Sequence, residues 1–244
     1  KACETQALTS EIYDRAFILC SYRNAKGATM IVIGHRGAAG HFPENTLRSI
    51  EIALDHGVDA VEIDARMLDD AIIVLHDETV DRTTSGNGHY KSLSLDKLRE
   101  LDAGDGERIP MLGEVVELIH GRIDLNVEVK EPGIAVPVIE DLLSHTKARK
   151  GWRPRLLLSS FDVATTYELA RHRGDMRLGI LYEDDFETAL ARAKTLEAYS
   201  LHMSIRSLDR SKVKRAHEAN IAVLVYTVNE ADDTAAADAI LQRL

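Results

Sequence analysis

Residues 58–77 read VDAVEIDARMLDDAIIVLHD, two apolar runs rich in β-branched residues that are separated by Asp69 and Asp70. Such residues favour strands, so we predict one strand over residues 59–64 and another over residues 71–75. The six residues 65–70 between them are too few for the crossover of about a dozen residues that joins parallel strands. We therefore predict an antiparallel hairpin that turns near Asp69 and Asp70 and places Asp64 opposite His76.

The remainder of the chain alternates short apolar runs with amphipathic stretches. We predict parallel strands over residues 31–34, 59–64, 124–129, 155–160, 177–181, 198–203 and 221–227. We predict helices over residues 45–56, 112–120, 134–145, 162–173, 185–196, 208–219 and 230–243. This alternation, with short loops, is typical of an α/β fold of the TIM-type (β/α)₈ barrel, in which right-handed crossovers join parallel strands. The last strand of such a barrel is missing from this sequence, so we expect a truncated or open barrel.

Three parts of the chain differ in composition. Residues 1–29 contain both cysteines, Cys3 and Cys20, and precede the first clear strand, so we interpret them as a leader outside the fold, non-native or disordered. Residues 30–244 are expected to form a single barrel domain. Within it, residues 78–111 are polar and rich in glycine, which predicts an insertion on the barrel rim, where lids and binding loops lie.

Charge and composition exclude several classes of partner. The formal net charge of −10 argues against a broad nucleic-acid surface or an anionic-membrane surface, both of which need an excess of lysine and arginine. No apolar stretch reaches the roughly 20 residues of a membrane span, and two cysteines support neither a disulfide framework nor a thiolate metal site. We therefore expect a cytoplasmic protein with a small-molecule ligand, no nucleic acid and no stable membrane anchor.

Three carboxylates stand inside apolar runs, where acidic residues are costly to bury unpaired. Glu62 and Asp64 share one side of their strand because side chains alternate, and Glu128 shares a side with Lys130 in the next parallel strand. Carboxylate oxygens without cysteine suit one hard divalent cation, Mg²⁺ or Ca²⁺. The alternative is a buried ion-pair network neutralised by Arg36, Arg66 or Lys130.

Two histidines follow apolar runs and are the candidate catalytic residues. His35 and His76 can divide proton removal and proton donation between them. Arg36 offers a rigid fork for a phosphate, and Lys130 a compact cation. We expect Asp77 to be a structural residue, because alternation along the strand turns it away from His76.

Two further residues have competing interpretations. Glu44 lies just before the first predicted helix, which Asn45 or Thr46 would cap. In one interpretation its negative charge stabilises the positive N-terminal end of that helix, and in the other its side chain leans toward the site. His202 stands at the end of a predicted strand. It is a reserve candidate for the site, with packing favoured.

The ordered motifs resemble the glycerophosphodiester phosphodiesterase family, of the phosphatidylinositol-phospholipase-C-like superfamily. They extend from residue 30 to about residue 230. They are His35-Arg36-Gly37, Pro43-Glu44-Asn45-Thr46, Glu62-Ile63-Asp64, His76-Asp77, Arg82-Thr83-Thr84, Ile109-Pro110-x-Leu112, Glu128-Val129-Lys130, Ser159-Ser160-Phe161 and Thr227-Val228-Asn229.

The resemblance implies a metal-dependent hydrolase that cleaves a glycerophosphodiester to glycerol 3-phosphate and an alcohol. It assigns the divalent ion to Glu62, Asp64 and Glu128, and the acid and base roles to His35 and His76. It assigns substrate binding to Arg36, Lys130, Phe161 and Tyr226. The family mechanism forms a cyclic phosphate by attack of the neighbouring glycerol hydroxyl, and water then opens this intermediate.

The sequence departs from the family pattern in three places. Tyr226 stands where the family has a tryptophan expected to line the glycerol pocket, so pocket size and affinity are expected to differ. The hairpin turn has Asp69-Asp70-Ala71 in place of the usual glycine. The final strand is missing, which bears on closure, stability and activity.

Two alternative functions remain open. A sphingomyelinase-D-like phospholipase has a related barrel and a similar arrangement of histidines and carboxylates, but its lipid-facing apolar loop has no match in the mostly polar residues 78–112. A non-catalytic barrel that binds a phosphate ligand, or an inactive truncated fragment, is the alternative from another class. The alcohol head group, the choice between Mg²⁺ and Ca²⁺ and the oligomeric state are open.

Overall fold

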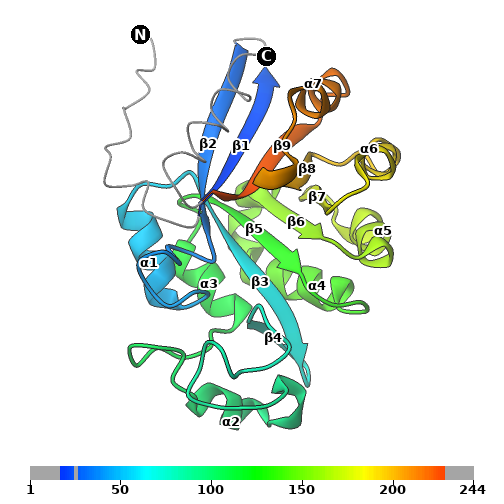
Figure 1. The fold of residues 1–244 in the computed structure, drawn as a ribbon. Helices are drawn as coiled ribbons and strands as arrows, with labels where there is room; N and C mark the ends of the chain where they lie inside the picture. Colours follow the sequence, from blue (N-terminus) through cyan, green and yellow to red (C-terminus); the bar gives the residue numbers. More distant parts are fainter. Residues whose placement is uncertain (1–16, 25–26, 229–244) are drawn as a thin grey trace.

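A ring of strands surrounded by helices forms the centre of the computed structural model, which describes residues 17–24 and 27–228 (Figure 1). The strands are β1 (Phe17–Asn24), β2 (Gly27–His35), β3 (Ala60–Leu68), β4 (Ala71–Val74), β5 (Asp124–Val129), β6 (Leu156–Ser160), β7 (Arg177–Leu181), β8 (Ser200–Ser204) and β9 (Ala222–Val228). The helices are α1 (Leu47–Asp55), α2 (Leu95–Glu100), α3 (Leu112–Ile119), α4 (Ala135–His145), α5 (Val163–His172), α6 (Phe186–Thr195) and α7 (Arg210–Glu218).

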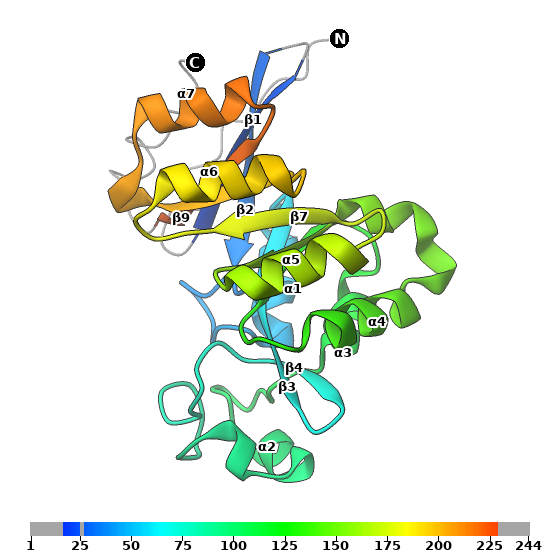
Figure 2. The same ribbon diagram turned by 90° about the vertical axis from the view of Figure 1, so that its right-hand side faces the viewer.

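The strand pairings confirm the predicted TIM-type barrel. Strands β2, β3, β5, β6, β7, β8 and β9 pair in parallel with their neighbours in this order. Helices α4 to α7 lie outside the sheet and cover it, as the second view shows (Figure 2). The predicted strands and the helices up to residue 219 are confirmed, with shifts of at most a few residues at their ends. The helix predicted over residues 230–243 lies outside the described residues.

Strand β1 fills the gap that the sequence left between the last and the first parallel strands. It pairs antiparallel with β2 on one side and with β9 on the other. Asn24 faces Gly27 in this hairpin, a connection far shorter than a parallel crossover but sufficient for antiparallel strands. Residues 17–24 and 27–29, expected outside the fold, therefore lie in its sheet. An eighth parallel strand does not occur among the described residues.

Alternation along the strands separates two environments. Val61, Ile63 and Val127 lie in the main hydrophobic core, together with buried residues of the helices such as Ile50 and Leu169. The residues between them in sequence face the inside of the barrel. One part of that interior is apolar and contains Ile33, Ala60, Leu157, Ala222 and Leu224. Burial of two opposite strand faces explains why these runs are nearly continuously hydrophobic.

The predicted hairpin between β3 and β4 is confirmed, but its register differs by one residue. Leu68 pairs with Ala71 across Asp69 and Asp70, so the centre of the turn lies between the two aspartates. The backbone N–H of Leu75 donates to the carbonyl oxygen of Asp64 at 3.0 Å. Asp64 therefore lies opposite Leu75, and the predicted pairing with His76 is wrong.

The insertion after β4 has a small core of its own. It contains the 3₁₀ turn η1 (Tyr90–Ser92) and helix α2, which the sequence did not predict. Ser94 caps α2 through its hydroxyl, which accepts from the backbone N–H of Lys97. Apolar residues of the hairpin and the insertion form a separate cluster: Leu68, Ile73, Leu75, Val80, Tyr90, Leu98, Ala103 and Ile109. The insertion thus packs on the hairpin at one side of the barrel (Figure 1).

His202 on β8 is buried inside the barrel, in agreement with a packing role. It is 1% exposed, and its Nε2 lies 2.9 Å from the Ser200 hydroxyl. Burial lowers its pKa from 6.5 to about 3. The unfolded chain therefore binds a proton that the folded protein does not, and stability is lost as the pH falls from 6.5 toward about 3. The slope is at most about 1.4 kcal/mol per pH unit.

Urea unfolding at pH 7.5 and at pH 4.5 tests this expectation. The difference in free energy of unfolding between the two pH values is expected to be smaller in His202→Gln than in the original protein, because glutamine does not titrate. An equal difference in both proteins would contradict the assignment.

Among the residues that the structure describes, no helix combines the length and the apolar character needed to cross a membrane.

Candidate active site

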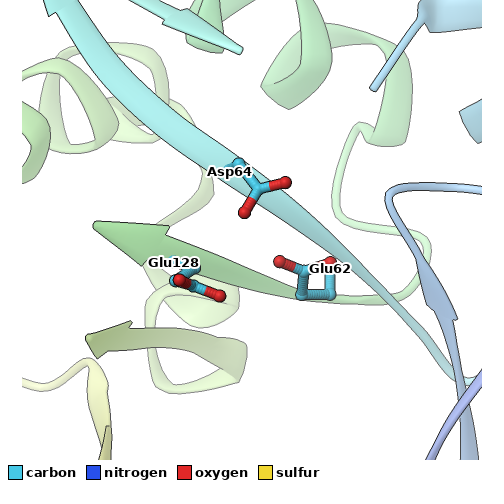
Figure 3. A group of neighbouring side chains, drawn as sticks. All are labelled: Glu62, Asp64 and Glu128. Atoms are coloured by element: carbon cyan, nitrogen blue, oxygen red, sulfur yellow. The ribbon is translucent and has the colours of Figure 1, made fainter. Parts of the chain in front are cut away.

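Three buried carboxylates from the neighbouring strands β3 and β5 converge (Figure 3). Glu62 and Asp64 come from β3, and Glu128 is the register neighbour of Asp64 on β5. One oxygen from each residue can be chosen so that all three lie within 4.8 Å of one another. The three residues are 2%, 1% and 8% exposed, respectively. The strand alternation expected from the sequence thus places them inside the barrel.

The three carboxyl groups differ in their charge balance. Burial, followed by repulsion from Asp64 and Glu128, raises the pKa of Glu62 well above its usual value. Burial and the charge of Asp64 also raise the pKa of Glu128. Burial works in the same direction on Asp64, but Lys130 and Arg36 outweigh it, and the pKa of Asp64 is lowered. The cations of the protein therefore neutralise Asp64 better than they neutralise Glu62.

The carboxylate cluster has oxygen atoms available for a divalent cation. Within the described part of the chain, Glu62 Oε1 and Asp64 Oδ1 are buried and accept no hydrogen bond. Lys130 Nζ lies 2.7 Å from Glu128 Oε1 and 3.4 Å from Asp64 Oδ1. Carboxylate oxygens that lie close together and accept no hydrogen bond are the donor set that Mg²⁺ and Ca²⁺ prefer. Glu62, Asp64 and Glu128 can therefore hold such an ion.

The alternative of a closed ion-pair network is only partly realised. Arg36 Nε lies 3.2 Å from Asp64 Oδ2, and Lys130 contacts the cluster as described. Arg66, the third candidate, instead donates from Nε and Nη2 to the carbonyl oxygen of His76 at 3.0 and 2.7 Å. Two cations thus face three carboxylates, which leaves an excess of negative charge.

His35 and Arg36 stand at the end of β2, next to Glu62. The backbone N–H of Arg36 donates to Glu62 Oε2 at 3.0 Å, with Arg36 in the left-handed region at φ 53°. His35 Nε2 lies 3.8 Å from the same oxygen. Burial, followed by the charge of Arg36, lowers the pKa of His35 to about 4, so the ring is neutral at pH 7.

His76 is paired with Asp77, which corrects the expectation that Asp77 points away. His76 Nδ1 lies 2.5 Å from Asp77 Oδ1. Strand β4 ends at Val74, so the alternation of a strand does not apply to residues 76 and 77. An Nδ1 proton donated to Asp77 leaves Nε2 free for proton exchange.

Glu44 and Asn45 reach the site from the loop before α1. Thr46 is the cap of α1, because its hydroxyl accepts from the backbone N–H of Ser49. Asn45 adopts φ 59°, a conformation that asparagine tolerates, and its Nδ2 donates to Asp64 Oδ2 at 2.8 Å. Arg36 Nη1 donates to Glu44 Oε1 at 2.7 Å. Glu44 therefore leans toward the site, and Asn45 is a site residue that sequence reasoning missed.

Arg82, in the insertion, is a second residue that the sequence did not assign to the site. Its Nε donates to Asp77 Oδ2 at 2.6 Å, and its Nη1 and Nη2 donate to the two oxygens of Glu44, both at 2.8 Å. Arg82 and Glu44 line a groove of about 560 Å³ between the loop before α1 and the insertion. The signal in the sequence was its place in the Arg82-Thr83-Thr84 motif.

Phe161 and Tyr226 form an aromatic wall at the ends of β6 and β9. Their ring centroids lie 6.0 Å apart with an interplanar angle of 85°, an edge-to-face contact. The Tyr226 hydroxyl donates to the carbonyl oxygen of Tyr182 at 3.1 Å. Burial, followed by the charge of Glu128, raises the pKa of Tyr226. Phe161 is 37% exposed, so this wall is accessible from solvent.

These side chains share the face of the barrel at which the parallel strands end. Active sites of TIM barrels lie at this face, and here it carries carboxylates, histidines, cations and an aromatic pair. Fold and site together define a barrel enzyme. Residues 35–242 match the Glycerophosphoryl diester phosphodiesterase family. The chain belongs to this family, whose members are hydrolases of glycerophosphodiesters.

Individual relatives agree with the family. The glycerophosphodiester phosphodiesterase of Caldanaerobacter subterraneus subsp. tengcongensis is 33% identical over 212 residues, 83% of this chain and 87% of that protein. A phosphodiesterase of Oleispira antarctica, solved in complex with the product sn-glycerol-3-phosphate, superimposes with a TM-score of 0.77 at 30% identity, covering 87% of this chain and 89% of that chain. The glycerophosphodiester phosphodiesterase of Thermotoga maritima has a TM-score of 0.70 at 26% identity, covering 86% and 91%.

Proposed function

We propose that this protein hydrolyses a small-molecule glycerophosphodiester to glycerol 3-phosphate and an alcohol, with one divalent cation, Mg²⁺ or Ca²⁺, held by Glu62, Asp64 and Glu128. The observation that carries the proposal is the buried carboxylate cluster, in which Glu62 Oε1 accepts no hydrogen bond and His35 Nε2 lies 3.8 Å from Glu62 Oε2. The glycerol 3-phosphate bound by the Oleispira antarctica phosphodiesterase supports the choice of product.

In the proposed mechanism, His35 and His76 exchange protons with the attacking hydroxyl and with the leaving oxygen. The ring that removes the proton must be neutral, and burial favours that form because it lowers the pKa of each ring. The ring that donates a proton to the leaving oxygen must be charged, and the hydrogen bond to Asp77 favours that form of His76. Asp77 accepts from Nδ1 of His76 and stabilises that ring when it is charged. A bound divalent cation supplies charge stabilisation for the phosphoryl oxygens.

Arg36 and Lys130 hold the phosphate in this proposal. Arg36 uses Nη1 for Glu44 and Lys130 uses a proton for Glu128, but a guanidinium has five N–H donors and an ammonium has three. Both side chains are largely buried, which strengthens their attraction for an anion. Phe161 and Tyr226 cover the apolar face of the glycerol moiety.

Removal of divalent cations is expected to abolish hydrolysis, and this is the direct test. Release of glycerol 3-phosphate from glycerophosphocholine should fall to background in EDTA and return on addition of excess Mg²⁺ or Ca²⁺. Activity that is indifferent to EDTA would contradict the metal site. Turnover of sphingomyelin or lysophosphatidylcholine in place of glycerophosphocholine would favour the sphingomyelinase-D-like alternative. Binding of glycerol 3-phosphate without turnover of any diester would favour the non-catalytic alternative.

A further inference from the structure

A chain of alternating charges joins the two sides of the site through Arg82. It runs from Asp77 through Arg82 to Glu44, and from there through Arg36 to Asp64. Glu44 lies in the loop before α1 and Arg82 in the insertion, so the contact joins two separate rim segments 38 residues apart in sequence.

The geometry of the contact requires an arginine. Three N–H groups of one planar guanidinium point at two carboxylates at the same time, with Nε on Asp77 and both Nη atoms on Glu44. A lysine has a single nitrogen on a flexible stem and cannot span both carboxylates in this geometry. Arg82 therefore determines where Asp77 and Glu44 lie relative to each other.

The first consequence concerns His76. Arg82 holds Asp77 Oδ2, which directs the other oxygen, Oδ1, at Nδ1 of His76. The Asp77 side chain is 25% exposed, so without Arg82 it is free to turn into solvent. The imidazole would then lose the partner that fixes its tautomer and its orientation.

The second consequence concerns Arg36. Glu44 Oε1 accepts from both Arg36 Nη1 and Arg82 Nη2, at 2.7 and 2.8 Å. Arg36 is thus held between Glu44 on one side and Asp64 on the other. Removal of Arg82 would leave Glu44 with a single cationic partner and the Arg36 fork less firmly oriented.

We propose that Arg82 is a positioning residue, which fixes His76 through Asp77 and Arg36 through Glu44. The inference rests on the proposed function for the roles of His76 and Arg36, but the effect of Arg82 on the His76 ring is independent of turnover. Arg82 itself does not contact the carboxylate cluster in any hydrogen bond or ion pair among the described residues.

The His76 tautomer is the first measurement. Long-range ¹H–¹⁵N spectra at pH 7.5, with His76 assigned by comparison with His76→Gln, show which ring nitrogen carries the proton. We expect an Nδ1 proton in the original protein and a mixture of tautomers in Arg82→Ala and in the closer-sized Arg82→Gln. An unchanged His76 tautomer in a folded Arg82 variant overturns the proposal. If the original protein hydrolyses no glycerophosphodiester but its His76 tautomer is fixed and becomes mixed in the Arg82 variants, this inference stands while the proposed function fails.

Kinetics give the second measurement. Arg82→Gln is expected to lower kcat by roughly 10²-fold, the size of effect that a displacement of about 1 Å in a catalytic group produces. Because Arg82 and Asp77 act on His76 in series, the double variant Arg82→Gln/Asp77→Asn should cost little more in kcat than the worse single variant. Glu44→Gln and Arg82→Gln are each expected to raise KM through Arg36. The double variant Arg82→Gln/Glu44→Gln should raise KM little more than the worse single variant does. If the fold-change of each double variant equals the product of the fold-changes of its two single variants, the serial arrangement is overturned.

Arg155→Ala is the matched control. Arg155 is 40% exposed against 49% for Arg82, and its Nε donates to Asp124 Oδ1 at 2.6 Å. Asp124 begins β5, so this ion pair lies at the opposite end of the strand from Glu128. Arg155→Ala is expected to change stability without changing kcat, KM or the His76 tautomer. A kcat loss in Arg155→Ala as large as in Arg82→Gln would show a general effect of losing a surface arginine, and would overturn the proposal.

Discussion

Glu62→Gln is expected to lower kcat by about 10³-fold, the loss of several kcal/mol of charge stabilisation from a metal ion, and to make the cation-free protein more stable. Glu62 is 2% exposed and lies beside two further carboxylates. Burial and their repulsion raise its pKa, and glutamine keeps the shape of the side chain while removing the charge. The backbone N–H of Arg36 retains an acceptor at this position.

The stability effect has a definite dependence on pH. A raised pKa in the folded state means that the folded protein holds this proton more tightly than the unfolded chain. The resulting stabilisation is complete below the unfolded value of 4.5 and is lost as the pH rises through the folded value. The stability advantage of Glu62→Gln in EDTA should therefore grow from acid to neutral pH.

Urea unfolding in EDTA and in excess Mg²⁺ or Ca²⁺ measures both halves of this prediction. The original protein should gain more stability from the cation than Glu62→Gln, since binding to the folded state adds its own free energy. Glu140→Gln, on the exposed side of α4, is the control for the same chemical change and should match the original protein. Lower stability of Glu62→Gln in EDTA would contradict the repulsion among the carboxylates.

His35→Ala and His76→Ala are each expected to lower kcat by about 10² to 10⁴-fold, the usual contribution of general acid or base catalysis. Neither ring is needed to hold the cation in the proposed site, so the rise in Tm that Mg²⁺ or Ca²⁺ produces should persist in both variants. The two histidines serve the same reaction, and the double variant should be far less impaired than the product of the single losses.

Initial rates of glycerol 3-phosphate release, with kcat and KM determined separately, test the histidines. His172→Ala, on an exposed position of α5, is the matched control and should keep the original rate. Full activity in His76→Ala would remove this residue from the mechanism. It would also mean that Arg82 does not influence the reaction through Asp77 and His76.

Local pattern predicted the strands and the sides on which their residues lie. The alternation of Glu62 and Asp64 with Val61 and Ile63 depends on the two-residue repeat of a strand, which holds wherever the strand forms. The hairpin followed from the short gap between two apolar runs. Its register was off by one residue because the sequence does not specify how many residues a turn contains.

The errors lie where local rules end. Asp77 follows the last residue of β4, so strand alternation no longer controlled its direction. Residues 17–24 are too close to β2 for a crossover between parallel strands, which is why we expect them outside the ring, but a short hairpin brings them into it antiparallel. The charge of Arg66 makes it a candidate counterion for the three carboxylates, but its guanidinium donates to the backbone carbonyl oxygen of His76 instead.

The sequence by itself determined the barrel, the family and the residue types that gather at the strand ends, because periodicity and motifs are carried by neighbours along the chain. The tertiary structure decided which charges meet. It left Glu62 Oε1 without a partner and joined Arg82 to Glu44 across 38 residues of sequence. Such contacts depend on how the rim segments pack against the barrel, and packing between distant segments is not contained in the pattern of either one.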